Sequence, residues 1–221
     1  MTVSGAGALG VWHGVAEGQE QAVEHWYNCE HHAERIAVPG FLRARRYLNL
    51  GPGLRYFSRY DVADVGVLAG PPYLAALDGP SPWSQRMFPH YRDTVRGAFA
   101  VQGRRGTADG GVVATLRFPS HPSETGDAFM RDIKPLLDSL AAAHGVLRAE
   151  AWLIDGAITS TRTKEKALRT APDAWPARAL VVDGSSAEAL RTALAQVVPE
   201  QMRGKATVDL MQLVFHAVAG G

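Results

Sequence analysis

The chain has 221 residues, of which 46% are hydrophobic and 20% are charged, and its formal net charge at pH 7 is +1. This balance is typical of a globular protein with a sizeable core, and it excludes a strong overall field that would attract nucleic acid or an anionic membrane. The single cysteine, Cys29, excludes an internal disulfide, and without a secretory signal or an apolar run near ~20 residues we expect a cytoplasmic protein with no membrane partner.

The first half of the chain alternates between strand and helix patterns. Apolar residues alternate in residues 7–15, which predicts a strand with His13 on the same face as Leu9 and Val11. The next helix ends at a Pro-Gly pair, and a Gly-Pro-Gly turn further on predicts a hairpin. The predicted strands are 7–15, 41–50, 54–60 and 96–102, and the predicted helices are 17–37 and 64–77. Pro71 and Pro72 should break or delay the second helix.

The second half repeats the same order of patterns. Residues 104–111 combine basic residues with glycines around Asp109, and this composition predicts a linker between the halves. The following helix carries Phe129, Ile133 and Leu137 on one face, which we expect to point inward. The predicted strands are 112–118, 147–154, 179–182 and 208–218, and the predicted helices are 124–143 and 187–197.

The order β-α-β-β-α-β therefore occurs twice and predicts an α+β fold built from tandem ferredoxin-like repeats, at residues 1–105 and 110–221. Each repeat would make a four-stranded antiparallel sheet with two helices on one face. The bare faces must be covered, so we expect the two sheets to pack against each other within the chain as a dimeric α+β barrel. The alternative is that each half pairs with a second chain in a homodimer.

The densest motif runs from Trp26 to Tyr47 and reads WYNCEHHAERIAVPGFLRARRY. It resembles a motif of the EthD-like branch of the dimeric α+β barrel superfamily, in which Trp-Tyr and Glu-His pairs on the first helix precede a Pro-Gly-Phe turn and an arginine-rich strand. The resemblance covers about the first hundred residues. The superfamily includes cofactor-free monooxygenases, lactone isomerases, polyketide cyclases and haem-binding peroxidase-like proteins, so the resemblance implies the fold more firmly than one reaction. The matching positions are Trp26, Tyr27, Glu30, His31, Pro39, Gly40, Phe41, Arg43, Arg46 and Tyr47, with Tyr73 and a turn ending at Trp83 further on.

Glu30 is the residue of this motif whose position carries a structural prediction. With about 3.6 residues per turn, Glu30 falls on the apolar stripe of Trp26 and Ala33. A carboxylate that faces a packed interior needs hydrogen bonds or a counter-charge, because bare burial costs several kcal/mol. We therefore expect Glu30 to be mostly buried against an arginine or tyrosine of the following hairpin, and Glu34 to lie nearer the rim.

The leading functional hypothesis is a cofactor-independent enzyme of the isomerase, cyclase or monooxygenase type that acts on a small apolar or aromatic oxygenated compound. His31 would transfer a proton, and Glu30 and Tyr47 would complete the catalytic set. The alternative is a non-catalytic protein that binds a small ligand or assembles through its barrel, with these side chains tying a helix end to a strand. Haem binding is a third, less favoured option. The candidate substrate-binding residues are His13, Arg43, Arg46, Tyr27 and Trp83.

The remaining patterns argue for ordinary structural roles. His25, Cys29 and His32 have a spacing that suits three metal ligands, but their side chains are predicted to diverge, so we expect no metal and no cofactor. His13 would be a pocket residue if its strand face lines the barrel, and a packed core histidine if that face meets the helices. His216 alone on the last strand is weak support for a haem ligand. The sequence has no dinucleotide-binding, P-loop, zincin or serine-esterase motif.

Overall fold

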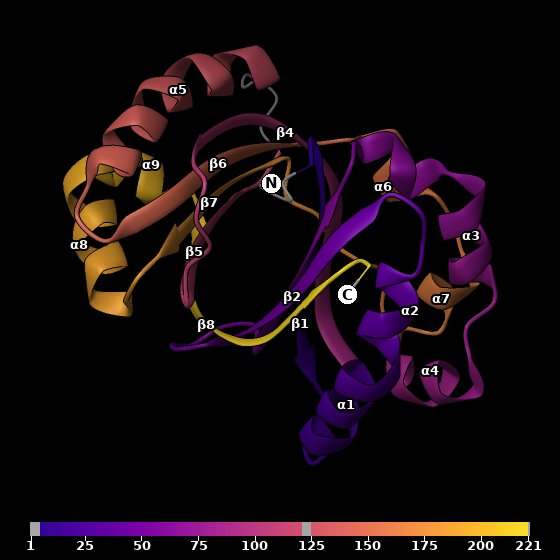
Figure 1. Cartoon of the computed structure of the whole chain (residues 1–221). Coiled ribbons are helices and arrows are strands. Elements are labelled where there is room, and N and C mark those ends of the chain that lie inside the picture. Colours follow the sequence, from indigo (N-terminus) through magenta and orange to yellow (C-terminus); the bar gives the residue numbers. More distant parts are fainter. Residues whose placement is uncertain (1–4, 121–124, 221) are drawn as a thin grey trace.

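In the computed structural model, which describes residues 5–120 and 125–220, eight antiparallel strands form one closed barrel with the helices on its outside (Figure 1). The strand order around the barrel is β1-β3-β2-β8-β5-β7-β6-β4, and β4 pairs with β1 to close it. The predicted α+β class is confirmed. The strands are β1 (Gly7–Val15), β2 (Phe41–Asn49), β3 (Tyr56–Val62), β4 (Tyr91–Gly106), β5 (Val112–Phe118), β6 (Val146–Ile154), β7 (Arg178–Gly184) and β8 (Thr207–Val218).

The helices lie in two groups on opposite sides of the barrel, α5, α8 and α9 on one side and the others across from them (Figure 1). Every helix in the described part of the chain is too short or too polar to span a lipid bilayer. The helices are α1 (Glu20–Trp26), η1 (Tyr27–His31), α2 (His32–Ile36), η2 (Val65–Ala69), α3 (Pro71–Asp78), α4 (Pro82–Met87), η3 (Phe88–His90), α5 (Gly126–Ala142), α6 (Gly156–Ser160), α7 (Lys164–Ala167), α8 (Ala187–Val197) and α9 (Glu200–Arg203).

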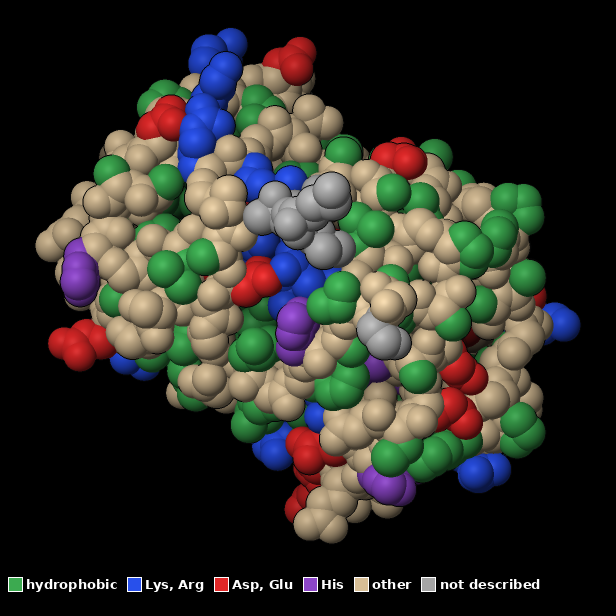
Figure 2. Space-filling model, viewed as in Figure 1, with side chains coloured by type: hydrophobic (Ala, Val, Ile, Leu, Met, Phe, Trp, Pro, Cys, Tyr) green, Lys and Arg blue, Asp and Glu red, His purple; other side chains and the backbone are tan. Residues whose placement is uncertain are grey.

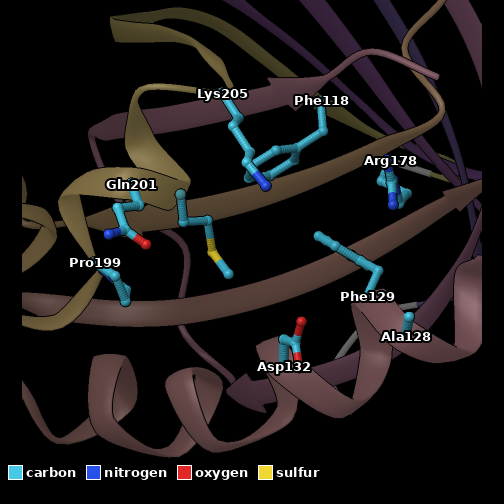
Figure 3. Close-up of a pocket in the computed structure, with 9 residues that line it drawn as sticks. Phe118, Ala128, Phe129, Asp132, Arg178, Pro199, Gln201 and Lys205 are labelled. Atoms are coloured by element: carbon cyan, nitrogen blue, oxygen red, sulfur yellow. The ribbon is translucent and has the colours of Figure 1, made fainter. Parts of the chain in front are cut away.

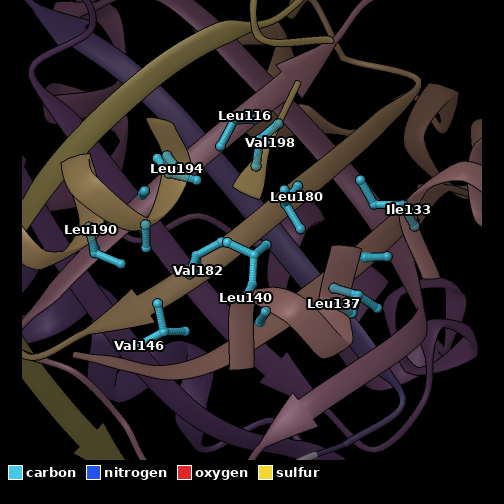
Figure 4. Close-up of a cluster of buried hydrophobic side chains, with 14 of the residues drawn as sticks. Leu116, Ile133, Leu137, Leu140, Val146, Leu180, Val182, Leu190, Leu194 and Val198 are labelled. Atoms are coloured by element: carbon cyan, nitrogen blue, oxygen red, sulfur yellow. The ribbon is translucent and has the colours of Figure 1, made fainter. Parts of the chain in front are cut away.

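Strand alternation divides the side chains of the barrel into two sets. On β1, Ala8 and Trp12 point into the barrel, whereas Leu9 and Val11 pack under the helices. Both faces of most strands are therefore buried. In the second half the outer face is an aliphatic core between α5, α8 and the sheet (Figure 4), and each large side chain buried there contributes roughly 1.5–3 kcal/mol. Its members include Leu116, Ile133, Leu137, Leu140, Leu180, Val182, Leu190 and Leu194.

The barrel interior is filled with side chains. One part is aromatic, and the ring of Trp12 stacks on Phe57 with centroids 4.5 Å apart. The other part is charged and is organised around Arg59, which lies on β3 and is 1% exposed. Its guanidinium donates to Asp61 at 2.8 Å, to Glu150 at 2.5 Å and to Asp183 at 3.3 Å. Charged side chains also occupy the middle of the face drawn in Figure 2.

Three predicted elements differ from the structure. The predicted helix 64–77 is split into η2 and α3, since Pro71 and Pro72 start a new helix. Strand β4 is far longer than the predicted 96–102, because it pairs with β1 and then continues along β6 in the other half. The last predicted linker residues, 107–111, remain as the connection to β5. The predicted helix 124–143 begins at Gly126 in the structure, and residue 124 lies outside the described part.

The polar stretch between β6 and β7 crosses from the second half to the first. It holds α6 and α7, which lie on the same side of the barrel as α3 (Figure 1). The backbone N–H of Lys164 donates to the side chain of Asp78 at 2.9 Å. Ala174 pairs with β4, accepting from the N–H of Arg96 at 2.8 Å and donating to Thr94 at 2.9 Å. This stretch therefore covers the first-half helices.

We expect Arg59→Met to lower the free energy of unfolding by about 3–5 kcal/mol, because it leaves buried carboxylates short of a positive charge. Urea denaturation at pH 7 measures this loss. The matched control is Arg105→Met, since Arg105 pairs with the 60% exposed side chain of Asp138 on the outside of the barrel. That variant should change stability by less than about 1 kcal/mol. Equal losses in the two variants would contradict the role given to Arg59.

Candidate functional site

The candidate site lies between the outer face of the first-half sheet and the helical segment α1–η1–α2. This segment contains a π-helical turn, η1, and such turns occur frequently at functional sites. Buried here is a set of imidazole and phenol side chains, which we call the histidine–tyrosine cluster. Its members are His13, Tyr27, His31, His32, Tyr60 and Tyr91.

The π-helical turn decides which side chains enter the cluster. Each π turn holds more residues than an α turn, so the regular helical spacing fails at this point. As a result His31 and His32 are buried, whereas Ala33 and Ala37 are exposed. The predicted apolar stripe through Trp26 and Ala33 is therefore wrong beyond Trp26. The buried face of this segment is polar.

A hydrogen-bond chain connects three members of the cluster. The Nδ1 of His13 lies 2.9 Å from the carbonyl oxygen of Gly14, and since a carbonyl only accepts, Nδ1 carries the proton. The Nε2 of His13 then accepts from the hydroxyl of Tyr27 at 3.2 Å. The hydroxyl of Tyr91 donates to that of Tyr27, and the Tyr91 ring stacks on His13 with centroids 4.0 Å apart. His13 therefore contacts Tyr27 on the helix side of the sheet as a packed core histidine, the second of its two predicted alternatives, and it is absent from the lining of the cavity described below.

His31 and His32 each have one buried ring nitrogen that makes no hydrogen bond to the described residues. His31 packs against Trp26, with centroids 4.3 Å apart, and its buried Nδ1 has no hydrogen-bond partner among the described residues. His32 stacks on Phe215 at 4.3 Å, and its Nδ1 lies 3.1 Å from the hydroxyl of Tyr60. Its Nε2 has no partner in the described part of the chain. Unsatisfied buried nitrogens are costly, at about 1–3 kcal/mol each.

Burial keeps the cluster uncharged. Desolvation lowers the pKa of His13 to about 3, and it holds the pKa of His31 and of His32 well below 6.5. Nearby guanidinium groups lower these values further, chiefly Arg35 beside His31. Desolvation also raises the pKa of the tyrosine hydroxyls in the cluster. At neutral pH the imidazoles are therefore uncharged and can accept a proton. The phenols keep their hydroxyl protons and can donate hydrogen bonds.

A small cavity of about 10 Å³ lies within this region, enough for about one water molecule. Charged groups close it on the side of the second half. Glu165 of α7 pairs with Arg35 and accepts from Arg169 at 3.2 Å, and Arg169 also pairs with Asp173. The lining residues are Leu9, Val11, Tyr27, His31, Arg35, Tyr60, Tyr73, Phe88, Tyr91, Arg96, Glu165 and Arg169.

Glu30 does not take the predicted place. It is half-buried, and its carboxylate accepts from Trp26 Nε1 at 3.1 Å, from Ser81 Oγ at 2.5 Å and from Ser84 Oγ at 3.4 Å. The expected contact with an arginine or tyrosine of the hairpin is wrong. The physical reason is the π-helical turn, which turns Glu30 toward the start of α4 and away from the sheet. Glu30 holds α4 against α1 and lies outside the cavity lining.

The sheet separates the other predicted residues. A bulge between Phe41 and Arg43 changes the side to which the following side chains point. Tyr47 stacks on Phe57 inside the barrel, with centroids 5.6 Å apart, and Arg43 donates to Asp61 there at 2.9 Å. Neither contacts His31 across the sheet.

Arg46 and Trp83 lie on the helix side of the sheet. The guanidinium of Arg46 lies 5.1 Å from the Tyr27 ring and donates to Asn28 at 3.2 Å, so it borders the cluster. Trp83 lies on α4, with its ring 5.4 Å from that of His25, and is absent from the cavity lining. Of the predicted set, His31, His13, Tyr27 and Arg46 come together.

Sequence reasoning missed the residues that close the cavity, above all Arg35, Glu165 and Arg169. Arg35 lies one helical turn after His31, so helical periodicity could have placed the two side chains on the same face. Glu165 and Arg169 stand one helical turn apart, but they come from the other half of the chain. Their position at the cavity depends on the path of the chain between β6 and β7, which no local sequence pattern predicts.

His25, Cys29 and His32, whose spacing would suit a metal, lie differently from the expected arrangement of two solvent-facing histidines beside a core cysteine. His25 and Cys29 are exposed, with Nδ1 and Sγ 3.5 Å apart, whereas His32 points into the cluster. Within the described ranges no group of three or more His, Cys, Asp or Glu side chains is arranged to hold a metal ion. The geometry thus offers no metal chemistry at these three positions.

A larger cavity of about 250 Å³ lies in the second half, between α5 and the α9 region (Figure 3). Phe118, Phe129 and Met202 form its apolar part, and Asp132 and Lys205 its polar part. Its described lining includes no histidine, tyrosine or cysteine. The smaller first-half cavity therefore has the denser acid–base chemistry, and we take it as the candidate active site.

Comparison with known proteins identifies the fold. No family model matches this sequence, and no curated protein matches it. Among solved structures, a protein assigned as a monooxygenase candidate from Fusobacterium nucleatum superposes with a TM-score of 0.59 at 11% identity, over 98% of this chain and 96% of the other. An anthrone oxidase-like protein has a TM-score of 0.56 at 10% identity, over 100% and 97% of the two chains.

A ferredoxin-fold protein related to antibiotic biosynthesis monooxygenases, from Listeria monocytogenes, has a TM-score of 0.50 at 7% identity, over 96% of this chain and 97% of the other. Identities this low establish a shared fold alone. The chain therefore shares the α+β barrel fold of these solved structures.

We expect the stability of the protein to fall as the pH decreases below 6.5. The pKa of His13 is about 3 in the folded state against 6.5 for a free histidine, so between these values the unfolded state binds a proton that the folded state does not. The buried histidine therefore stabilises the fold above pH 6.5, and this contribution is lost toward pH 3. His13→Gln should remove about one proton from the pH dependence of unfolding, measured by urea denaturation from pH 7 to pH 5. The exposed His25→Gln should leave it unchanged, and the same pH dependence in wild type and His13→Gln would rule the mechanism out.

Proposed function

We propose that this protein is a cofactor-independent enzyme that transfers a proton on a small aromatic oxygenated compound, with His31 as the base. The observation that carries this proposal is the state of His31. Its imidazole is buried and uncharged, it lines a cavity, and its Nδ1 makes no hydrogen bond to the described residues, with Glu34 Oε2 the nearest recorded acid at 3.9 Å. A fold retains such a costly atom when function needs it, and perturbed, unpaired groups concentrate in active sites.

The proposed step is the removal of a proton from carbon next to a carbonyl. The C–H bond breaks, the proton goes to His31 Nδ1, and the electron pair becomes an enolate. Arg96 and Arg169 line the same cavity and would hold the enolate oxygen. Return of the proton to another carbon is an isomerisation, and attack of the enolate on a second carbonyl is a cyclisation. In a monooxygenase reaction the enolate carbon bonds to dioxygen to give a peroxide; loss of the remaining C–H proton and cleavage of the O–O bond then leave a new carbonyl and release the second oxygen as water, so that the substrate is oxidised and dioxygen is reduced.

The low basicity of His31 restricts the substrate class. A histidine with a pKa well below 6.5 is a weak base, and proton transfer is efficient when donor and acceptor are matched. The substrate should therefore carry an activated C–H group, as in a ketone whose enolate is conjugated with an aromatic ring. The ring faces of Tyr60, Phe88 and Tyr91 suit such a ligand.

Entry of this ligand requires the cover to move. The cavity as it stands holds about one water molecule, and its closing contacts are the ion pairs of Glu165 with Arg35 and Arg169. All of α6 and α7 belongs to one connection between β6 and β7, so it can move without breaking the barrel. We propose that this connection opens for substrate and closes over it.

The alternative function is binding of a small ligand without chemistry. The filled barrel interior supports it, because the expected sheet-to-sheet cavity is occupied by side chains. Haem binding has less support from the closed structure than either of these functions. The outer face of the second half is filled by aliphatic side chains, and the first-half cavity is far smaller than a porphyrin. Absorption of the purified protein in the Soret region would contradict this assignment.

We also propose that residues 1–105 and 110–221 are tandem ferredoxin-like repeats of an EthD-like protein. The strand order β4-β1-β3-β2 of the first half corresponds strand by strand to β8-β5-β7-β6 of the second. The motif from Trp26 to Tyr47 supports the EthD-like branch, because its His31, Tyr27 and Arg46 surround one site.

The test uses 2-tetralone, a ketone with an activated CH₂ group beside an aromatic ring. Wild-type protein in D₂O without oxygen should exchange these protons for deuterium faster than buffer does, measured by proton NMR. His31→Gln should lower the enzymatic rate by about 10²–10⁴-fold, because it removes the base.

The matched control is His25→Gln, an exposed histidine on the preceding turn, which should retain the wild-type rate. Saturable binding of 2-tetralone with no exchange above buffer would favour the ligand-binding alternative. Full activity in His31→Gln would exclude His31 as the base.

A further inference from the structure

A second feature of the protein lies at one mouth of the barrel, on the opposite side of the sheet from the histidine–tyrosine cluster. The connection between β4 and β5 carries Asp109 into this mouth. Its carboxylate pairs with Arg43, with Arg45 at 2.6 Å and with Arg148 at 2.6 Å. Basic and acidic side chains gather in the middle of this face in the space-filling view (Figure 2).

Positive charge exceeds negative charge in this part of the barrel, and Asp109 reduces the excess from two charges to one. Five guanidinium groups meet there. The strands β3, β6 and β7 supply only three carboxylates as their partners. Asp109 is the fourth acid and comes from a connecting loop. Without its carboxylate, two positive charges would remain uncompensated. The arginines are Arg43, Arg45, Arg59, Arg104 and Arg148, and the strand acids are Asp61, Glu150 and Asp183.

The arginines at the mouth have unused donors. Arg45 and Arg148 are 1% and 0% exposed, and both Arg45 Nε and Arg148 Nη1 have no hydrogen-bond partner among the described residues. A carboxylate has two oxygens, and those of Asp109 are already shared by three guanidinium groups. A tetrahedral oxyanion with more oxygens and a double charge would match this arginine set better.

The electrostatics of the mouth agree with this charge count. Burial opposes ionisation of Asp109, but the surrounding arginines lower its pKa, and Arg45 has the largest effect among them. His216 lies opposite Arg45 on β8, and burial together with Arg45 and Arg43 lowers its pKa. The mouth therefore disfavours further positive charge and favours an anion.

The loop allows Asp109 to leave the mouth without disturbing the barrel. The side chain of Asp109 is 33% exposed, so solvent reaches it. Gly106 has a φ of +79°, and a Cβ there would lie 2.2 Å from the carbonyl oxygen of Leu147. A Cβ on Gly110 would likewise lie 2.3 Å from the oxygen of Gly184. The two glycines hold the ends of the loop against neighbouring strands, and residues 107–109 between them are exposed, so their movement would not unpack the core.

We propose that this mouth is a binding site for a phosphate group, and that the carboxylate of Asp109 occupies it in the free protein. A phosphate dianion would displace Asp109 and bind Arg43, Arg45 and Arg148. The same chemistry is present in free phosphate and in a phosphomonoester. This site is independent of His31, because the sheet separates the two.

The experiment compares Asp109→Asn with wild type by isothermal titration calorimetry of the full chain, at constant ionic strength set with chloride. The probes are inorganic phosphate and glycerol 2-phosphate, whose relative affinities distinguish the two sources. Asp109→Asn should bind phosphate at least about tenfold more tightly than wild type, because the competing carboxylate is gone. The added substitution Arg43→Gln should remove most of this gain.

The matched control is Asp138→Asn, an acid that pairs with Arg105 on the outside of the barrel and should bind phosphate as wild type does. Equal affinity in Asp109→Asn and Asp138→Asn would overturn the proposal. If Asp109→Asn does not fold, thermal denaturation of wild type decides. Phosphate must then raise its melting temperature more than chloride at equal ionic strength, and an equal effect of the two salts would overturn the proposal.

Discussion

The charge network around Arg59 is the constraint on which the rest of the structure depends. The interior of a closed eight-stranded barrel must be filled with side chains. Here charged side chains occupy one part of it. Each buried ion costs several kcal/mol to desolvate, so the loss of one partner would destabilise the network. The interior is therefore rigid and occupied. A ligand site of the usual kind inside the barrel is excluded, and chemistry moves to the outside of the sheet or to the barrel mouth.

The histidine–tyrosine cluster is a consequence of the π-helical turn. Because η1 contains extra residues, two adjacent histidines face inward while the alanines that would have packed there face solvent. The sequence thus places costly polar groups where aliphatic side chains would stabilise the fold. In the second half the equivalent face is filled by leucine, isoleucine and valine. The two halves therefore differ in what packs between sheet and helices: imidazole and phenol groups in the first half, and mainly aliphatic side chains in the second.

The two halves also depend on each other through the cover of the cavity. Glu165 and Arg169 belong to the connection between β6 and β7, yet they neutralise and close a space beneath the helices of the first half. Arg35 would otherwise be a buried cation without a counter-charge. The ion pairs of Glu165 therefore neutralise Arg35 and hold this connection against the helices of the first half. Separation of the halves would expose the cluster and leave Arg35 unpaired.

Much of the architecture follows from the sequence by itself. The alternation of strand and helix patterns predicts the α+β class, and turn residues such as Pro39 and Gly40 mark where elements end. The α+β class and the end of the first helix before Pro39 agree with the structure, whereas the roles assigned to His31, Tyr27 and Arg46 of the motif remain predictions. The two that agree do so because periodicity and turn chemistry are local properties of the chain.

Only the tertiary structure decided the sides on which the side chains lie. A single bulge after Phe41 sends Arg43 and Tyr47 into the barrel while Arg46 faces the helices, and a single π turn moves Glu30 away from the sheet. Side chains on a strand alternate with a period of two residues, so one inserted residue exchanges the two faces and no local pattern records it. The closing of the cavity by Glu165 joins residues far apart in the chain. Such contacts depend on the free energy of the whole packed fold, which no short segment contains.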